Sequence, residues 1–175
     1  MAMFSHRRRR PGTLWRIVAG IATLTVVVAF SIAPVPPAMA DEARLRLDGA
    51  AVSDLGADLR VLAVGAQADD PGSADGAVSF VHVAPGGVSH FVGAVTCLRQ
   101  NDLGQVQLSG QVLDGVTAGG VVLTGKDFFF TLVAGDGPQA FSLPAFADAG
   151  VRGGCSGGGA QRVAVTHGGV LVNPR

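Results

Sequence analysis

One serine of this sequence lies in a pattern that hydrolases use for a nucleophile. The run Gly154-Cys155-Ser156-Gly157-Gly158 contains G-x-S-x-G, the nucleophile elbow that holds a serine between a strand and a helix. Here glycines surround the serine, and the residues after it alternate as a strand would. The elbow also needs an acid and then a histidine after the serine, but no Asp or Glu follows Asp148. The sequence therefore argues against this elbow.

The same loop is similar to the G-D-S-G-G loop of trypsin-like proteases, whose catalytic residues come in the order His, Asp, Ser. Cysteine stands here where that family has aspartate, and neither candidate histidine lies in a T-A-A-H-C-like motif. The chain is also too short for two six-stranded barrels. We expect no coherent catalytic set, and a small secreted hydrolase using Ser156 is kept as an alternative. If the chain did have the catalytic set of these proteases, its members would be His82 or His90, Asp102 or Asp127, and Ser156.

Metal ligation is the other chemistry that the residue types suggest. His82 and His90 flank the turn Pro85-Gly86-Gly87 on two expected strands, so their side chains could face each other. A zinc site needs three or four ligands, and no third ligand is evident. Three carboxylates crowd the loop from Asp69 to Asp75, but their spacing does not match a calcium-binding loop. We expect no metal and no other cofactor.

The first forty residues have the layout of a secretory signal peptide. Arginines at 7–10 form the positive start, Ile17–Ile32 is an uncharged apolar run, and Ala38-Met39-Ala40 has the small residues of a cleavage site. We expect cleavage between Ala40 and Asp41. The product would be secreted or held at the cell surface, with no stable membrane insertion. An uncleaved anchor is the alternative, although the run falls short of the roughly 20 residues that span a bilayer.

Both cysteines, Cys97 and Cys155, belong to the exported part and are 58 positions apart. Exported chains with an even number of cysteines usually pair them, so we predict a disulfide. Closing a loop of that length stabilises a fold by roughly 4 kcal/mol in the chain-entropy model. Two buried thiols or intermolecular pairing are the alternatives.

Composition excludes some partners once the signal is removed. Eight basic and thirteen acidic residues remain, so the net charge is −5 where the full chain has zero. Nucleic acids need clustered Lys and Arg, so they are not expected partners. The single tryptophan, Trp15, lies in the signal and the chain has no tyrosine. Sugar binding by stacking on exposed Trp or Tyr rings is therefore disfavoured.

Apolar residues alternate with a period of two through most of the exported part. Gln105–Leu113 is the clearest example, with valine and leucine on one face and glutamine on the other, which predicts an antiparallel strand with one wet face. Such segments, separated by turns, predict an all-β domain: a single antiparallel β-sandwich, or a small barrel, of about eight or nine short strands. The expected strands are Leu59–Val64, Ala77–Val83, Phe91–Leu98, Gln105–Leu113, Val121–Thr124, Asp127–Val133, Gln139–Leu143, Gln161–Thr166 and Val170–Val172.

Three parts of the chain follow from these patterns: a signal peptide over 1–40, a lead-in segment over 41–58 and the β-domain over 59–175. Ala50–Leu59 is the best candidate for a helical turn. Two hairpins are expected, through Gly125-Lys126 and through His167-Gly168-Gly169.

Three segments of strand-like sequence together carry a resemblance to known proteins: Val95-Thr96-Cys97-Leu98, Gly104–Val112 and Asp127–Leu132. They resemble a loose group of small secreted β-rich proteins of unknown function from high-GC bacteria. That group's pattern is V-x-C-L, a turn, V-x-x-x-G-x-V, then a G-x-x-F-x-F-x-V strand and an acidic-glycine turn, here Gly135-Asp136-Gly137. The resemblance covers about Gly76 to Val172. It implies a β-sandwich of uncharacterised function and no particular functional residues.

The leading functional hypothesis is a non-enzymatic, secreted or envelope-associated module. Its partner would be another protein or an envelope component, bound through an exposed sheet face or through an edge strand such as Gln105–Leu113. A second hypothesis is a carrier of a small apolar ligand, if the sheet closes into a barrel around phenylalanines. Those phenylalanines are Phe80, Phe91, Phe128 and Phe130.

Overall fold

The computed structural model of the protein describes residues 45–70, 73–134, 137–150, 155, 159 and 161–174. No helix long and apolar enough to cross a membrane occurs among these residues. The expected signal peptide, with Ala40 and Asp41, lies outside them, and so does Ser156. The strands are β1 (Leu45–Asp54), β2 (Leu59–Ala68), β3 (Asp75–Ala84), β4 (Gly87–Gln100), β5 (Val106–Val116), β6 (Asp127–Val133), β7 (Ala140–Ser142), β8 (Ala145–Ala147), β9 (Arg162–Ala164) and β10 (His167–Pro174).

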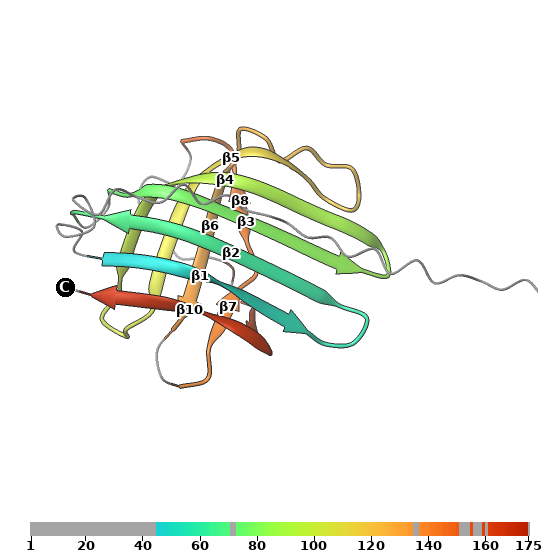
Figure 1. Ribbon diagram of the computed structural model, residues 1–175. Coiled ribbons are helices and arrows are strands. Elements are labelled where there is room, and N and C mark those ends of the chain that lie inside the picture. Colours follow the sequence, from blue (N-terminus) through green and yellow to red (C-terminus); the bar gives the residue numbers. More distant parts are fainter. Residues whose placement is uncertain are drawn as a thin grey trace, which may run out of the picture. The chain divides into compact units, whose positions relative to one another are not determined.

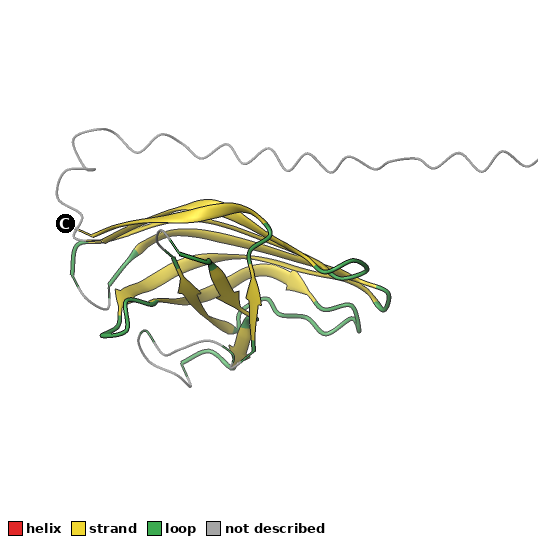
Figure 2. Cartoon of the chain, turned by 90° about the horizontal axis from the view of Figure 1, so that it is seen from below, coloured by secondary structure: helices red, strands yellow, loops and turns green. Residues whose placement is uncertain are grey.

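All these strands belong to one antiparallel sheet, in the order β10-β1-β2-β3-β4-β5-β6-β7-β9, with β8 paired to β6. The all-β prediction is confirmed. The sheet curls on itself, so the architecture is closer to the barrel alternative than to two stacked sheets (Figures 1 and 2). Strands alternate between buried and more exposed residues, as β2 does throughout its length. One face of the sheet, here called the inner face, therefore forms the core.

The curl brings strands together that are distant in the order of the sheet. The rings of Phe80 on β3 and Phe141 on β7 are 6.4 Å apart, although β4, β5 and β6 separate these strands. The ring centroid of Phe91 lies 5.4 Å from that of Phe128 and 6.0 Å from that of Phe130. Aromatic rings thus fill the middle of the inner face, at the centroid separations that favour ring pairs.

Glycines on β4 and β5 make room for these rings. A Cβ at Gly93 would lie 2.6 Å from Cε1 of Phe128, and one at Gly110 would lie 1.8 Å from the carbonyl oxygen of Ala94. The ladder between β4 and β5 also shifts register at Val92/Gly93 and between Val95 and Cys97. Such irregularities bend a strand. Here they help the sheet to curl around its aromatic core.

The two ends of the sheet are joined by the short connection between β9 and β10. The backbone N–H of Val165 donates to the carbonyl of Gln139 next to β7, and that of Thr166 donates to the carbonyl of Val52 on β1 (2.9 and 2.7 Å). The Val170 N–H donates to the Gln139 side chain at 2.9 Å. This connection therefore ties the first and last parts of the sheet together.

A buried strip on the opposite, outer face follows from the irregularity in β4. Cys97, Ser109 and Phe129 lie side by side on β4, β5 and β6 and are all buried. Phe129 and Cys97 are not part of the main core cluster. Cys155 bonds to Cys97, with their Cα atoms 5.3 Å apart, so the predicted disulfide is present and places Cys155 beside this strip.

Three local expectations are wrong. Val121–Thr124 is not a hairpin strand, because it makes one bridge, Val122 to Val116, and folds back along β5. The expected hairpin through His167-Gly168-Gly169 does not form, because β9 pairs with β7 and β10 pairs with β1. The segment expected as lead-in and helical turn contains β1, which is paired on both sides.

The proposed use of Gln105–Leu113 as an edge strand is also contradicted. β5 pairs with β4 along one side and with β6 along the other. Its backbone groups over Val106–Gln111 are therefore already used within the sheet, and a partner strand cannot add there.

Candidate functional site

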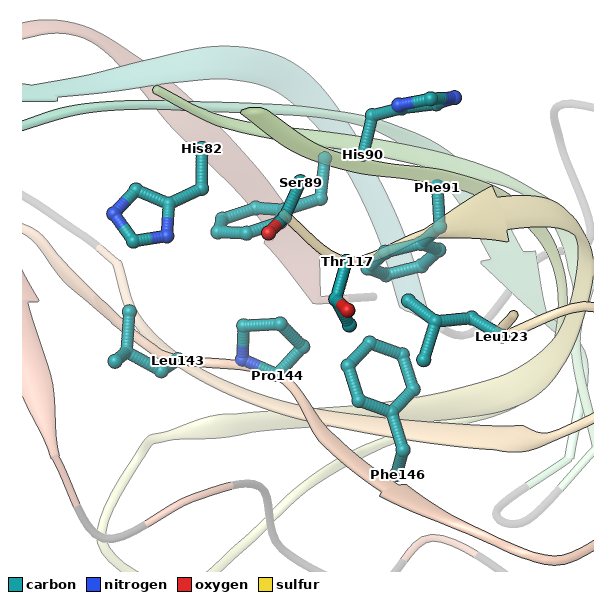
Figure 3. Close-up of a pocket in the computed structure, with 10 residues that line it drawn as sticks. His82, Ser89, His90, Phe91, Thr117, Leu123, Leu143, Pro144 and Phe146 are labelled. Atoms are coloured by element: carbon teal, nitrogen blue, oxygen red, sulfur yellow. The ribbon is translucent and has the colours of Figure 1, made fainter. Parts of the chain in front are cut away.

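A pocket of about 180 Å³ lies at the end of the sheet where β3 meets β4, and it is partly open to solvent. Figure 3 shows its side chains, which come from β3, β4, the segment after β5 and the stretch from Leu143 to Phe146. Most of the lining is apolar. The lining residues are Phe80, His82, Ser89, His90, Phe91, Thr117, Leu123, Leu143, Pro144 and Phe146.

The apolar wall is an extension of the aromatic core. Phe80 and Phe91 are opposite each other in the β3–β4 ladder, and the ring of Phe146 meets Phe91 edge-on at 5.3 Å. Leu123, which is buried, reaches the pocket because its segment folds back along β5. One residue that the sequence assigned to a hairpin strand, Leu123, thus lines the pocket.

The polar wall begins with His82 and Ser89, which are also opposite each other in the ladder. Nε2 of His82 is 2.5 Å from Oδ1 of Asp58, in the turn between β1 and β2. The Ser89 hydroxyl accepts a hydrogen bond from the Ala118 N–H at 2.8 Å. Among the described residues, His82 and Ser89 thus bond to Asp58 and Ala118 and not to each other.

Behind His82 the polar groups continue across the inner face. The register places Ser53, Arg60, His82 and Ser89 in one row over β1, β2, β3 and β4. Asp58 binds both Arg60, through Oδ2, and His82, through Oδ1. Arg60 is 5% exposed, an uncommon state for an arginine. We call these four residues and Asp58 the polar row.

His82 and His90 do not face each other as the sequence suggested. His90 is opposite Val81 in the ladder, one position out of phase with His82, and its ring points away from the other pocket side chains in Figure 3. The two rings therefore lie on different faces of the sheet. Within the described ranges, no three His, Cys, Asp or Glu residues lie together as a possible metal site.

The other candidate residues are placed apart from the pocket. His82 takes its carboxylate partner from Asp58, and not from Asp102 or Asp127. Asp127 accepts a hydrogen bond from the Gly150 N–H at 2.8 Å. Ser156 lies outside the described residues, so the hydrolase hypothesis that depends on it stays a prediction.

Sequence reasoning missed Asp58 and Arg60. A signal for them exists, because Arg60 is in phase with the apolar Leu62 and Val64 of the same strand. A charged residue on the apolar phase of a strand is buried, paired or functional. The sequence gives no comparable signal for Ser53 or Thr117.

Comparison with protein-family models, curated proteins and solved structures finds no match for this chain. The function must therefore be argued from the pocket and its surroundings alone.

Proposed function

We propose that this chain is an exported, non-enzymatic protein that binds a small apolar ligand in the pocket between β3, β4 and Leu143–Phe146. The carrying observation is a partly open cavity of about 180 Å³ whose lining is mostly apolar. Ligand sites in proteins combine such walls with a few polar groups. Export is supported by the sequence of residues 1–40 and is compatible with the Cys97–Cys155 disulfide.

This proposal places the ligand differently from the carrier hypothesis of the sequence. Phe80, Phe91, Phe128 and Phe130 pack against one another at centroid distances of 5.4 to 6.2 Å. The centre of the curled sheet is therefore occupied by side chains. Only Phe80 and Phe91 of these four also line the pocket, so the ligand lies at the end of the aromatic core.

The size of the pocket indicates the size of the ligand. An engineered apolar cavity of about 150 Å³ in another protein holds benzene. A cavity of about 180 Å³ accordingly suits one aromatic ring with a small substituent, or an aliphatic group of similar bulk.

The first experiment is native mass spectrometry of the protein recovered from the culture medium without reductant. It reads the N-terminus, the disulfide and any retained small molecule in one spectrum. The second is a titration with benzyl alcohol, followed by the methyl NMR signals of Leu123 and Leu143. We expect those two residues to shift, while Leu103, which is 79% exposed and outside the pocket lining, does not.

A filled-pocket variant gives the matched control. Leu143→Phe adds bulk to the lining and is expected to abolish the benzyl alcohol response, whereas Leu103→Phe is expected to keep it. Equal binding by the two variants, or no response of the unmodified protein at millimolar benzyl alcohol, contradicts the proposal.

The interaction-module hypothesis keeps one observation of its own. Val83 and Val88 are cross-strand partners on β3 and β4, and they are 38% and 50% exposed. Val92 and Leu113 are also exposed on neighbouring strands. Self-association of the protein, weakened by Val88→Asp in sedimentation equilibrium, would favour this second function.

A further inference from the structure

Three buried polar atoms near the pocket have no hydrogen-bond partner. They are Oγ of Ser53 and the Nε and Nη1 atoms of Arg60. Over the described residues, these are the buried side-chain nitrogens and oxygens without a partner. Ser53 and Arg60 are opposite each other in the β1–β2 ladder, so the three atoms belong to one place in the fold.

Arginine makes this arrangement informative. Its guanidinium carries five N–H donors and does not lose its charge in proteins. Asp58 accepts from Nη2, and its second oxygen is already held by His82. One carboxylate therefore serves two basic side chains, and most of the Arg60 donors are left without an acceptor. A native structure with such a group generally has a water, an ion or a ligand there.

The unpartnered atoms of Arg60 lie one strand away from the pocket lining. Arg60 is the ladder partner of His82, which lines the pocket, and neighbouring strands are only about 4.8 Å apart. The His82 side chain is 28% exposed and stands between Arg60 and Ser89 in the polar row. Arg60 does not itself line the pocket, so binding of a ligand group at Arg60 requires the His82 side chain to turn away from Asp58.

We propose that the pocket binds a small organic acid, whose apolar body lies against Phe80 and Phe91 and whose carboxylate is bound by Arg60. This inference rests on the proposed function and adds the chemical class of the ligand. The carboxylate supplies acceptors to the Arg60 Nε and Nη1 donors, which have no partner in the fold. Charge-assisted hydrogen bonds of this kind are the strong ones in proteins.

The test compares two ligands with the same ring, benzoate and benzyl alcohol, by isothermal titration of the disulfide-bonded protein. We expect benzoate to bind at least about tenfold more tightly, because a hydrogen bond to a charged group supplies a factor of this order. Arg60→Met is expected to remove that preference by weakening the binding of benzoate. Arg46→Met, which alters another arginine paired to an aspartate two residues away, is expected to keep the preference.

A spectroscopic measurement on the unmodified protein covers the case in which Arg60→Met does not fold. The Nε–H signal of Arg60 is expected to move on addition of benzoate and to stay in place with benzyl alcohol. Equal affinities for the two ligands, a preference that survives Arg60→Met, or an unmoved Nε–H signal overturns the inference alone. If neither compound binds, the proposed function fails together with it.

Discussion

The sheet carries two arginine–aspartate pairs with the same spacing, one on each face. On β1, Arg46 pairs with Asp48 on the outer face, and their side chains are 38% and 37% exposed. At the start of β2, Asp58 pairs with Arg60, whose side chain points to the inner face and is 6% exposed. Residue types and separation are the same, but the order is reversed and the pairs lie on different faces. Asp58 also lies in the turn before β2 and bonds His82 as well.

The difference shows what burial does to an ion pair. Water and salt surround Arg46 and Asp48, so their attraction contributes little to stability. Arg60 is removed from water, and one shared carboxylate does not repay that desolvation. We therefore expect the inner pair to stabilise the fold less than apolar side chains of similar volume would, and this agrees with the proposed binding of a ligand at Arg60.

The buried residues of the two faces are held in different ways. Removing the disulfide tests the outer face alone. The inner face is closed by the curl of the sheet, whereas the buried strip of the outer face is fastened through Cys155. Replacing Cys97 and Cys155 together by alanine is expected to lower the free energy of unfolding by about 4 kcal/mol, the loop-closure value for 58 residues. Urea unfolding measures it, and a loss below about 1 kcal/mol would show that the outer strip holds without the bond.

Removing the aspartate of each pair tests the comparison directly. Asp58→Asn leaves the Arg60 charge uncompensated in the interior and is expected to destabilise the fold by about 2 kcal/mol. This is less than the roughly 3–5 kcal/mol of a fully buried pair, because Asp58 is itself 34% exposed. Asp48→Asn is expected to change stability by at most about 0.5 kcal/mol. Equal effects in thermal unfolding would remove the distinction between the faces.

Replacing the inner arginine is expected to affect stability in the opposite direction to replacing its aspartate. Arg60→Met deletes the buried charge itself and keeps an apolar stem of similar length, so we expect a change within about 1 kcal/mol, in the stabilising direction. Arg46→Met is expected to be nearly neutral. Thermal unfolding of the two variants at the same pH measures both. A loss above about 2 kcal/mol for Arg60→Met would mean that Arg60 holds the fold together and is not kept for binding.

Local alternation was enough to predict most of the strands, and the failures have physical causes. β1 contains Gly49, Ala50 and Ala51, which show little alternation, and it is held as a strand by β10 from the far end of the sequence. Gly168 suggested a turn, but a Cβ there would lie 2.3 Å from the carbonyl oxygen of Ala50. That glycine serves close approach of two strands, which sequence reasoning cannot distinguish from a turn.

The neighbours of His82 in the candidate site could not be predicted from the sequence either. The sequence singled out His82 and suggested His90 as its companion, because only separation along the chain was known. The ladder instead places His82 beside Arg60 and Ser89. Register between strands depends on pairing over long distances, so the polar row becomes visible only in the folded sheet.

A third ion pair contains the most exposed side chain of the three pairs and is expected to contribute least to stability. Nζ of Lys126 is 2.7 Å from Oδ1 of Asp148, and the Asp148 side chain is 82% exposed. The hydrogen bond from Lys126, and then its charge, lower the pKa of Asp148 below its ordinary value of 3.8. A carboxyl whose pKa is lowered by folding contributes stability above its unfolded pKa, and this is lost as pH falls through the folded pKa.

Lys126→Met is therefore expected to raise the pKa of Asp148 back toward 3.8 and to leave thermal stability at pH 7 unchanged within error, because exposed pairs are screened by water and salt. Carboxyl NMR titration between about pH 2 and 6 measures the pKa in both proteins, which brackets the ordinary aspartate value. A clear loss of stability at pH 7 would show that exposure does not rank these ion pairs. The exposed ion pairs could then no longer serve as the standard against which the burial of Arg60 is judged.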